Sequence, residues 1–181
     1  MQQSGQLPLA LQLREGNDLD NFVPAGNGAA LQGVREVVTG NDRQAFVWGV
    51  TGQGKSHLLE GAVRLAQQQG LSACLLPAQE LMPLSPEVLE SMEQFTLLAL
   101  DDAEHFAGQP QWEEALFHLY NRLMANGGRL VVTASASPGA LGLALPDLAT
   151  RLAAGPVYRL QTLEEEGLET LLQDRAKARG L

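Results

Sequence analysis

The segment that most constrains the fold of this chain is GVTGQGKS at residues 49–56. It matches the pattern G-x-x-x-x-G-K-[ST], whose glycines let backbone amides approach phosphate oxygens. Lys55 can reach the β and γ phosphates of a nucleotide, and the Ser56 hydroxyl can ligate Mg²⁺. A chance match in an ordinary glycine turn is rare. All the fixed positions of the pattern would have to agree, and glycine supplies only about 7% of average sequence. We therefore expect this segment to bind nucleotide phosphates.

The residues on either side of the loop predict a strand before it and a helix after it. Residues 45–48 form a short apolar run, and residues 55–69 carry apolar side chains at helical spacing. Further strands are expected at 72–76, 96–100, 129–133 and 157–160, and further helices at 28–39, 86–92, 111–125, 146–152 and from 162 to 179. This alternation predicts an α/β fold, with a five-stranded parallel sheet between two layers of helices. We expect an extended tail over 1–18 and a core domain over 19–181.

Two adjacent carboxylates, Asp101 and Asp102, end the apolar strand expected at 96–100. In a parallel sheet the carboxyl ends of the strands border the ligand crevice, so Asp101 would lie beside the Mg²⁺ that Ser56 holds. Asp102 could orient or deprotonate an attacking water. Two carboxylates are also a common way for a strand to end, and the phosphate loop upstream is what gives this pair a functional interpretation.

Composition narrows the class of protein. The formal net charge is −9 and the only lysines are Lys55 and Lys177, so the chain lacks the basic surface that releases counterions from DNA, and we expect no strong direct DNA binding. No apolar run is long enough to cross a bilayer, and the first residues do not resemble a secretory signal, so no membrane association is expected. The single cysteine, Cys74, is interpreted as a buried small hydrophobe in a reducing compartment, which favours a cytoplasmic location.

Five segments resemble those of the DnaA-type AAA+ proteins. Asp20-Asn21-Phe22-Val23, followed by Gly26-Asn27, resembles the stretch that in this group packs near the adenine. GVTGQGKSHLL resembles their phosphate loop, and LLALDDAEHFAG resembles their Walker B strand and the turn beyond it. LFHLYNRL is similar to the helix that follows, and LPDLATRLAAG is similar to the segment that carries their arginine finger. The phosphate loop alone is evidence at the level of the superfamily. The resemblance extends from Gln6 to the end of the chain, and it implies the P-loop NTPase (AAA+) fold.

The resemblance also implies roles for individual residues. Ser56 and Asp101 would bind Mg²⁺, and Arg151 matches the arginine finger, which in regulatory members of this group completes the ATP site of a neighbouring DnaA in trans. A rigid guanidinium can stabilise charge that develops on the γ-phosphate, although composition alone would make Arg151 an ordinary surface residue. An adenine nucleotide, ADP or ATP, would be held by Phe22, Val23, Thr51, Gly52, Gln53, Gly54, Lys55, Ser56 and His57.

The segment at residues 6–11, QLPLAL, is similar to the short peptide by which regulatory inactivators of DnaA bind the DNA polymerase sliding clamp (its beta subunit). Gln6 would be the polar anchor, and Leu7, Leu9 and Leu11 would enter the apolar pocket of the clamp, a recurring mode of peptide recognition. The alternative is a segment that packs on its own domain. The chain starts almost directly at the AAA+ domain and carries no basic helix-turn-helix domain, which favours a regulator over the initiator.

The chain departs from the family pattern in two places. Relatives usually carry an acidic or amide residue soon after the threonine that ends the fourth strand, whereas this chain has Ser135, a poor match for the γ-phosphate sensor. The chain also ends at Leu181, where the helical lid of the family would follow. It is either a fragment or a naturally short protein, and without the lid we expect a weaker grip on the nucleotide, because lid closure excludes water.

Three functions fit these features. The first is a regulatory adaptor that binds the sliding clamp and stimulates ATP hydrolysis by DnaA, with weak or no ATPase activity of its own. The second is an enzyme in its own right: an AAA+ ATPase such as a DnaA-like initiator or helicase loader, or a P-loop kinase. The third is an interaction module that only retains the fold. The sequence leaves open the resident nucleotide and the oligomeric state, a homodimer included.

Overall fold

The computed structural model describes residues 13–24, 26–52, 54–162, 173 and 176. The helix expected from 162 to 179 and the clamp-type peptide at residues 6–11 lie outside the described residues. Among the described residues, no helix combines the length and the apolar character that crossing a bilayer requires.

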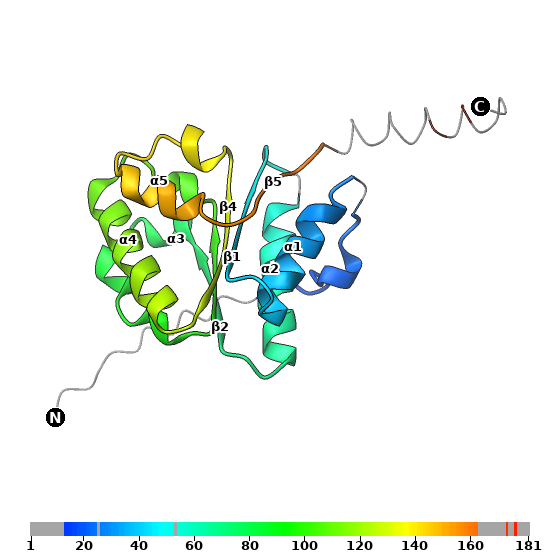
Figure 1. The fold of residues 1–181 in the computed structure, drawn as a ribbon, viewed down its shortest axis with the longest axis horizontal. Helices are drawn as coiled ribbons and strands as arrows, with labels where there is room; N and C mark the ends of the chain where they lie inside the picture. Colours follow the sequence, from blue (N-terminus) through cyan, green and yellow to red (C-terminus); the bar gives the residue numbers. More distant parts are fainter. Residues whose placement is uncertain (1–12, 25, 53, 163–172, 174–175, 177–181) are drawn as a thin grey trace.

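A parallel sheet runs through the centre of the described structure (Figure 1). Its five strands lie in the order β2-β3-β4-β1-β5, and every neighbouring pair is parallel. The strands are β1 Gln44–Trp48, β2 Ala73–Pro77, β3 Leu97–Asp101, β4 Arg129–Ala134 and β5 Val157–Arg159. The predicted five-stranded parallel α/β fold is therefore confirmed, with each strand within two residues of its expected bounds.

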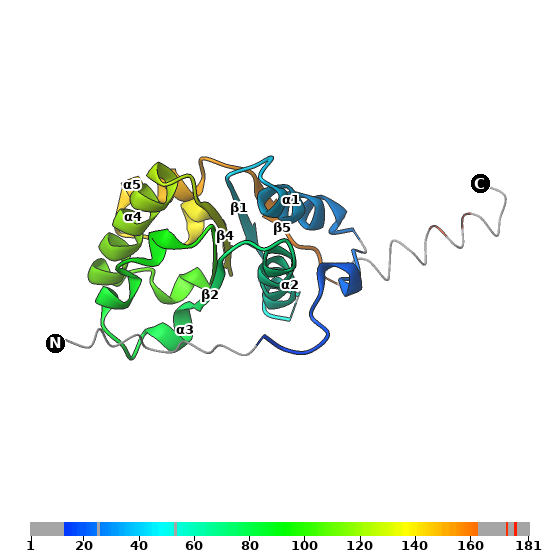
Figure 2. The ribbon, with the colours of Figure 1, turned by 90° about the horizontal axis from the view of Figure 1, so that it is seen from below.

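Helices cover both faces of the sheet, which gives the three layers expected from the sequence (Figure 2). On one face lie α1 Gly28–Thr39 and α2 Lys55–Gln68; on the other lie α3 Ala78–Leu81, α4 Pro110–Ala125 and α5 Pro146–Leu152. Five short 3-10 helices complete the described structure: η1 Leu19–Asn21, η2 Pro86–Leu89, η3 Met92–Gln94, η4 Ala103–His105 and η5 Pro138–Ala140.

The helix predicted over 86–92 is wrong. The structure has two 3-10 helices there, η2 and η3, and Ser91 between them takes the left-handed conformation with φ 67°. A residue with that φ cannot continue a right-handed helix. Local backbone geometry therefore divides the segment into two 3-10 helices.

The sheet has a separate hydrophobic core on each face. On the α1–α2 face the strands contribute Ala45, Val47, Leu97, Ala99 and Val131, and on the opposite face they contribute Phe46, Leu98, Leu100, Leu130 and Val132. Side chains alternate between the two faces of a strand, so strands buried on both sides read as continuous apolar runs. This is why the strands were recognisable in the sequence.

Residues 13–23 form a segment, here called the strap, that lies against α2. The buried carboxylate of Glu60 on α2 holds its first part: one oxygen accepts the backbone N–H of Arg14 at 2.9 Å and the side-chain amide of Asn17 at 3.0 Å. A buried carboxylate is stable only when donors compensate it. The strap supplies those donors, and this attaches it firmly to the helix.

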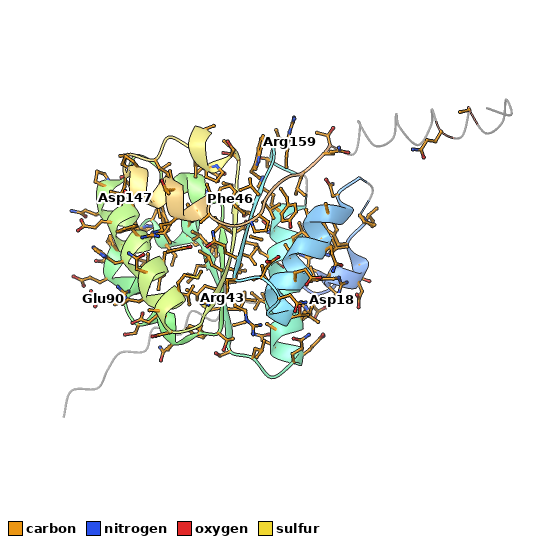
Figure 3. All side chains as sticks on the ribbon, viewed as in Figure 1. Asp18, Arg43, Phe46, Glu90, Asp147 and Arg159 are labelled. Atoms are coloured by element: carbon orange, nitrogen blue, oxygen red, sulfur yellow. The ribbon has the colours of Figure 1, made fainter. Side chains whose placement is uncertain are left out.

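An ion pair and a close apolar contact hold the middle of the strap. Arg64 on α2 pairs with Asp18 at 2.9 Å, and Leu19 is buried against the same helix. Gly61 makes this close approach possible, because a Cβ atom there would lie 2.9 Å from the backbone nitrogen of Leu19. Figure 3 shows Asp18 on the outer side of the α1–α2 layer, far from Glu90 on the opposite side of the molecule.

Cys74, expected to be buried, is half-buried on the edge strand β2. Burial raises the pKa of its thiol, since an apolar environment disfavours the thiolate.

We predict that Gly61→Ala lowers the free energy of unfolding by about 1–3 kcal/mol, because the new methyl group must displace the backbone of the strap. Gly28→Ala on α1 is the matched control, since a Cβ atom added at Gly28 would meet no other atom within 4 Å. Urea unfolding measures both variants. Equal stability of the two would show that the strap does not pack tightly on α2.

Candidate functional site

The candidate site lies at the carboxyl ends of β1, β3 and β4. The phosphate loop connects β1 to α2, and Asp101 is the last residue of β3. Strand β4 lies between β1 and β3 in the sheet, so the loop and the carboxylate face each other across it. Ligands bind at this edge of open parallel sheets, where the loops from neighbouring strands diverge.

The loop has the backbone geometry that its glycines predict. Gly52 and Gly54 have φ of 88° and 89°, in the left-handed region that favours glycine, and Gly54 immediately precedes α2. Thr51 and Gly52 are exposed. Gln53 lies outside the described residues. The amino-terminal end of α2 thus opens directly into the loop, and helix amino termini attract phosphate through free N–H groups and the helix dipole.

The lysine of the loop is held inside it. Lys55 is only 7% exposed, and its ammonium group donates to the carbonyl of Gly49 at 2.7 Å and to the carbonyl of Val50 at 3.1 Å. A buried ammonium group needs such partners. Its position concentrates positive charge at the loop, although the chain as a whole is acidic.

Ser56 and Asp101 meet as the sequence predicts. The Ser56 hydroxyl donates to Oδ2 of Asp101 at 2.7 Å, although the two residues are 45 positions apart. Both supply oxygen, the donor that Mg²⁺ prefers, and Mg²⁺ usually binds one or two carboxylates together with substrate phosphates. Among the described residues, no group of three or more acidic, histidine or cysteine side chains is arranged to hold a metal ion by itself. The donor set therefore fits a Mg²⁺ ion that is shared with a nucleotide.

Asp102 is half-buried and has left-handed backbone angles, φ 54° and ψ 52°. Burial is the main cause that raises the pKa of its carboxyl group, and the neighbouring carboxylates of Asp101 and Glu104 raise it further. Lys55 and His105 act in the opposite direction. Asp102 thus places a second carboxylate close to the pair formed by Ser56 and Asp101.

The residues expected near the adenine separate into two environments. Phe22 is buried, its ring meets that of His57 edge to face at 5.5 Å, and it packs against Gly54. His57 also hydrogen-bonds the carbonyl of Asp18 at 2.8 Å, so its ring faces the strap. Val23, in contrast, is 67% exposed and is free to contact a ligand. The strap therefore reaches the phosphate loop directly.

Ser135, the candidate sensor, is exposed just beyond the end of β4. Its backbone N–H donates to the carboxylate of Glu104 at 3.1 Å, which connects the ends of β3 and β4. Glu104 and His105, both in η4, are partly buried in this connection.

Arg151 lies apart from these residues. It is exposed near the end of α5, and its carbonyl accepts the side-chain amide of Gln44, the first residue of β1. The phosphate loop follows the other end of that strand, and five strand residues span roughly 13 Å. The guanidinium group forms no ion pair with any described residue. The structure thus leaves Arg151 out of the group that surrounds the chain's own loop.

The structural roles of three residues around the site were not predicted from the sequence. Thr133 bonds both carboxylate residues, Glu60 anchors the strap, and Asn27 accepts the backbone N–H of Gln161 at 2.7 Å, which connects the start of α1 to the segment after β5. A polar residue within the apolar run LVVTA was a usable signal for Thr133. Glu60 breaks the apolar face of α2 in the same way.

The chain is similar to known proteins both in sequence family and in structure. Residues 85–158 match the family model of the bacterial DnaA ATPase domain. The matched segment contains Asp101, Thr133 and Arg151, and the phosphate loop precedes it.

Among solved structures, the replication initiator DnaA bound to AMPPCP and single-stranded DNA has a TM-score of 0.77 and 22% sequence identity, over 94% of this chain and 57% of that one. The DnaC helicase loader has a TM-score of 0.63 and 16% identity, over 80% of this chain and 97% of that one. Protein NMB1076 from Neisseria meningitidis is 32% identical over 67% of this chain and 76% of that one, with a TM-score of 0.51.

At such low identities the DnaA and DnaC matches show the fold, which is that of the P-loop NTPases predicted from the sequence. The chain spans 57% of the length of the first solved structures that it matches.

We predict that Lys55→Met lowers the affinity for ATP by at least about tenfold, because the charge-assisted contact with phosphate is lost while the aliphatic part of the side chain remains. Arg122→Met, on α4 and paired with Glu93, is the control cation and should leave affinity unchanged. Titration with a fluorescent ATP analogue measures both. Unaltered affinity of Lys55→Met would contradict the assignment of the loop.

Proposed function

We propose, with the DnaA-type AAA+ family as the premise, that this chain regulates the initiation of DNA replication in the manner of Hda, the regulatory inactivator of DnaA. In this proposal the chain binds the DNA polymerase sliding clamp through residues 6–11. It then stimulates ATP hydrolysis by DnaA with Arg151. Its own adenine nucleotide, with Mg²⁺, mainly organises the domain.

The observation that carries this proposal is the separation of Arg151 from the chain's own phosphate loop. The backbone of Arg151 contacts Gln44 at the start of β1, whereas the loop follows the end of β1. An arginine in this place is suited to reach the nucleotide of another molecule, and its side chain is exposed. Stabilising charge on the transferred γ-phosphate is the established chemical task of such an arginine.

The residues around the loop support nucleotide binding by this chain. Lys55 and the amide groups of the loop would contact the phosphates, while Ser56 and Asp101 would hold Mg²⁺. When bound, the ion neutralises charge on the β and γ phosphates. Asp102 is the candidate base for hydrolysis. Its side chain is shorter than the glutamate that many such ATPases use, which favours slow hydrolysis by the chain itself.

The strap supports a connection between clamp and nucleotide. It begins close to the clamp-type peptide in the sequence, and it contacts α2 through Glu60 and the phosphate loop through Phe22. A clamp-bound peptide would therefore be attached, within a few residues, to a rigid part of the nucleotide-binding domain. Such attachment would hold Arg151 in a limited set of positions relative to the clamp.

The second candidate function is an ATPase of the helicase-loader or initiator type. This candidate is supported by the structural match with the DnaC helicase loader, which extends over 97% of that chain. The DnaA relative was solved with single-stranded DNA, but the net charge of −9 makes strong DNA binding by this chain unfavourable. ATP hydrolysis by the purified chain alone, at a rate that clamp and DnaA do not change, would support this alternative.

We expect deletion of residues 6–11 to abolish binding to DNA-loaded clamp while ATP affinity changes less than about twofold, because recognition by a short extended peptide is local. The paired substitutions Gln2→Ala and Gln3→Ala lie in the same tail but outside the peptide, and they should bind clamp normally. Surface plasmon resonance on immobilised clamp makes the measurement. Full clamp binding without residues 6–11 would reject the adaptor mechanism.

We expect Arg151→Ala to reduce clamp-dependent stimulation of DnaA ATP hydrolysis by about 10³-fold or more, the range for loss of an arginine finger. Clamp binding should be retained, because the tail is intact. Arg122→Ala serves as the control for loss of a surface arginine. Phosphate release is measured with DnaA, DNA-loaded clamp and each variant; stimulation by Arg151→Ala at the wild-type level would refute the role.

A further inference from the structure

Thr133 is a polar residue in the middle of the buried sheet. It lies near the end of β4, it is 0% exposed, and the strand residues before it are the apolar Leu130, Val131 and Val132. Val132 pairs with Leu100 of β3, so Thr133 lies level with Asp101, the next residue of that strand. A hydroxyl group in this environment must find hydrogen-bond partners.

Both hydrogen-bonding capacities of this hydroxyl are used on the two carboxylate residues. Oγ1 of Thr133 donates to Oδ1 of Asp101 at 2.5 Å and accepts the backbone N–H of Asp102 at 3.1 Å. The first bond is charge-assisted and therefore among the stronger ones available to a side chain. The second holds the peptide that leads into Asp102, whose φ of 54° is uncommon for a residue other than glycine.

The bond from Thr133 helps to fix the direction of the Asp101 carboxylate. One oxygen, Oδ1, is bound by Thr133 and the other, Oδ2, accepts the hydroxyl of Ser56 at 2.7 Å. The terminal torsion of an aspartate is otherwise broad, so a carboxylate held at one oxygen only can rotate. With Thr133 in place, Oδ2 is the oxygen directed toward the phosphate loop.

We propose that Thr133 is a positioning residue, which fixes the Asp101 carboxylate so that Oδ2 and the Ser56 hydroxyl together receive the Mg²⁺ ion of a bound nucleotide. This inference rests on the nucleotide site of the proposed function. Thr133 would then strengthen Mg²⁺-dependent nucleotide binding indirectly, through the Asp101 carboxylate.

A purely structural role makes a different prediction. If Thr133 only satisfies a buried carboxylate, its loss lowers stability and affects nucleotide binding equally with and without Mg²⁺. If it positions Asp101, its loss acts on the Mg²⁺-dependent part of the affinity. The ratio of ATP affinities measured with Mg²⁺ and with EDTA therefore separates the two roles.

The test compares wild type, Thr133→Val and Thr133→Ser by titration with a fluorescent ATP analogue in Mg²⁺ and in EDTA. Valine retains the shape of threonine and removes the hydroxyl, whereas serine retains the hydroxyl. We expect the ratio of the ATP affinity in Mg²⁺ to that in EDTA to be about tenfold smaller for Thr133→Val than for the wild type. This is the size expected for the loss of a hydrogen bond to a charged group. Affinity in EDTA should change less than about twofold, and Thr133→Ser should keep the wild-type gain.

Should Thr133→Val not fold, Thr133→Cys replaces it, because a thiol is a weak donor of similar size, and the same loss is expected. An undiminished Mg²⁺ gain in the valine or cysteine variant overturns the role of Thr133 and leaves the proposed function intact. A wild-type chain whose ATP affinity does not respond to Mg²⁺ overturns this inference together with the Mg²⁺ site assigned to Ser56 and Asp101. Failure of the adaptor function itself would appear separately, in clamp binding and in DnaA stimulation.

Discussion

The contact between the Ser56 hydroxyl and the Asp101 carboxylate is the interaction on which the candidate site depends. It joins the start of α2 to the end of β3, and it forms only because β4 lies between β1 and β3 in the sheet. In this order a single strand separates the phosphate loop from the acidic strand end, a distance that the side chains of Ser56 and Asp101 span. The fold therefore acts mainly as a spacer, which brings a hydroxyl and a carboxylate together at the edge where a phosphate can join them.

Around this contact the polar side chains compensate one another. Lys55 is buried yet bonded to loop carbonyls, Asp101 is buried yet bonded by two hydroxyl groups, and Asp102 is held through its backbone. In a medium of low dielectric constant such a network is stable only when its members have partners. The same arrangement holds an ammonium group, a hydroxyl group and a carboxylate together at the end of β3 and the start of α2.

The strap is a second part of the structure that contacts the candidate site. Residues before α1 would be a loose leader if only the sheet held the domain together, yet Glu60 and Arg64 bind them to α2 and Phe22 packs on Gly54. The helix that begins at the phosphate loop thus also carries the segment that leads to the clamp-type peptide. Because α2 serves both, the proposed function treats the peptide at residues 6–11 and the nucleotide site as one functional unit.

The local features of this protein can be read from its amino-acid sequence alone. The glycines of the loop require left-handed backbone angles, and the doubly buried strands appear as apolar runs, so the loop, the strands and the α/β class could be predicted without coordinates. The failure at 86–92 came from two residues, Glu90 with extended and Ser91 with left-handed backbone angles, which no spacing pattern reveals. The partners of individual side chains became visible only in the folded domain: Thr133 bonds Asp101, Glu60 bonds Arg14, and Arg151 lies away from the loop. These contacts join residues far apart in the chain. They depend on strand order and helix placement, which local periodicity in the sequence does not reveal.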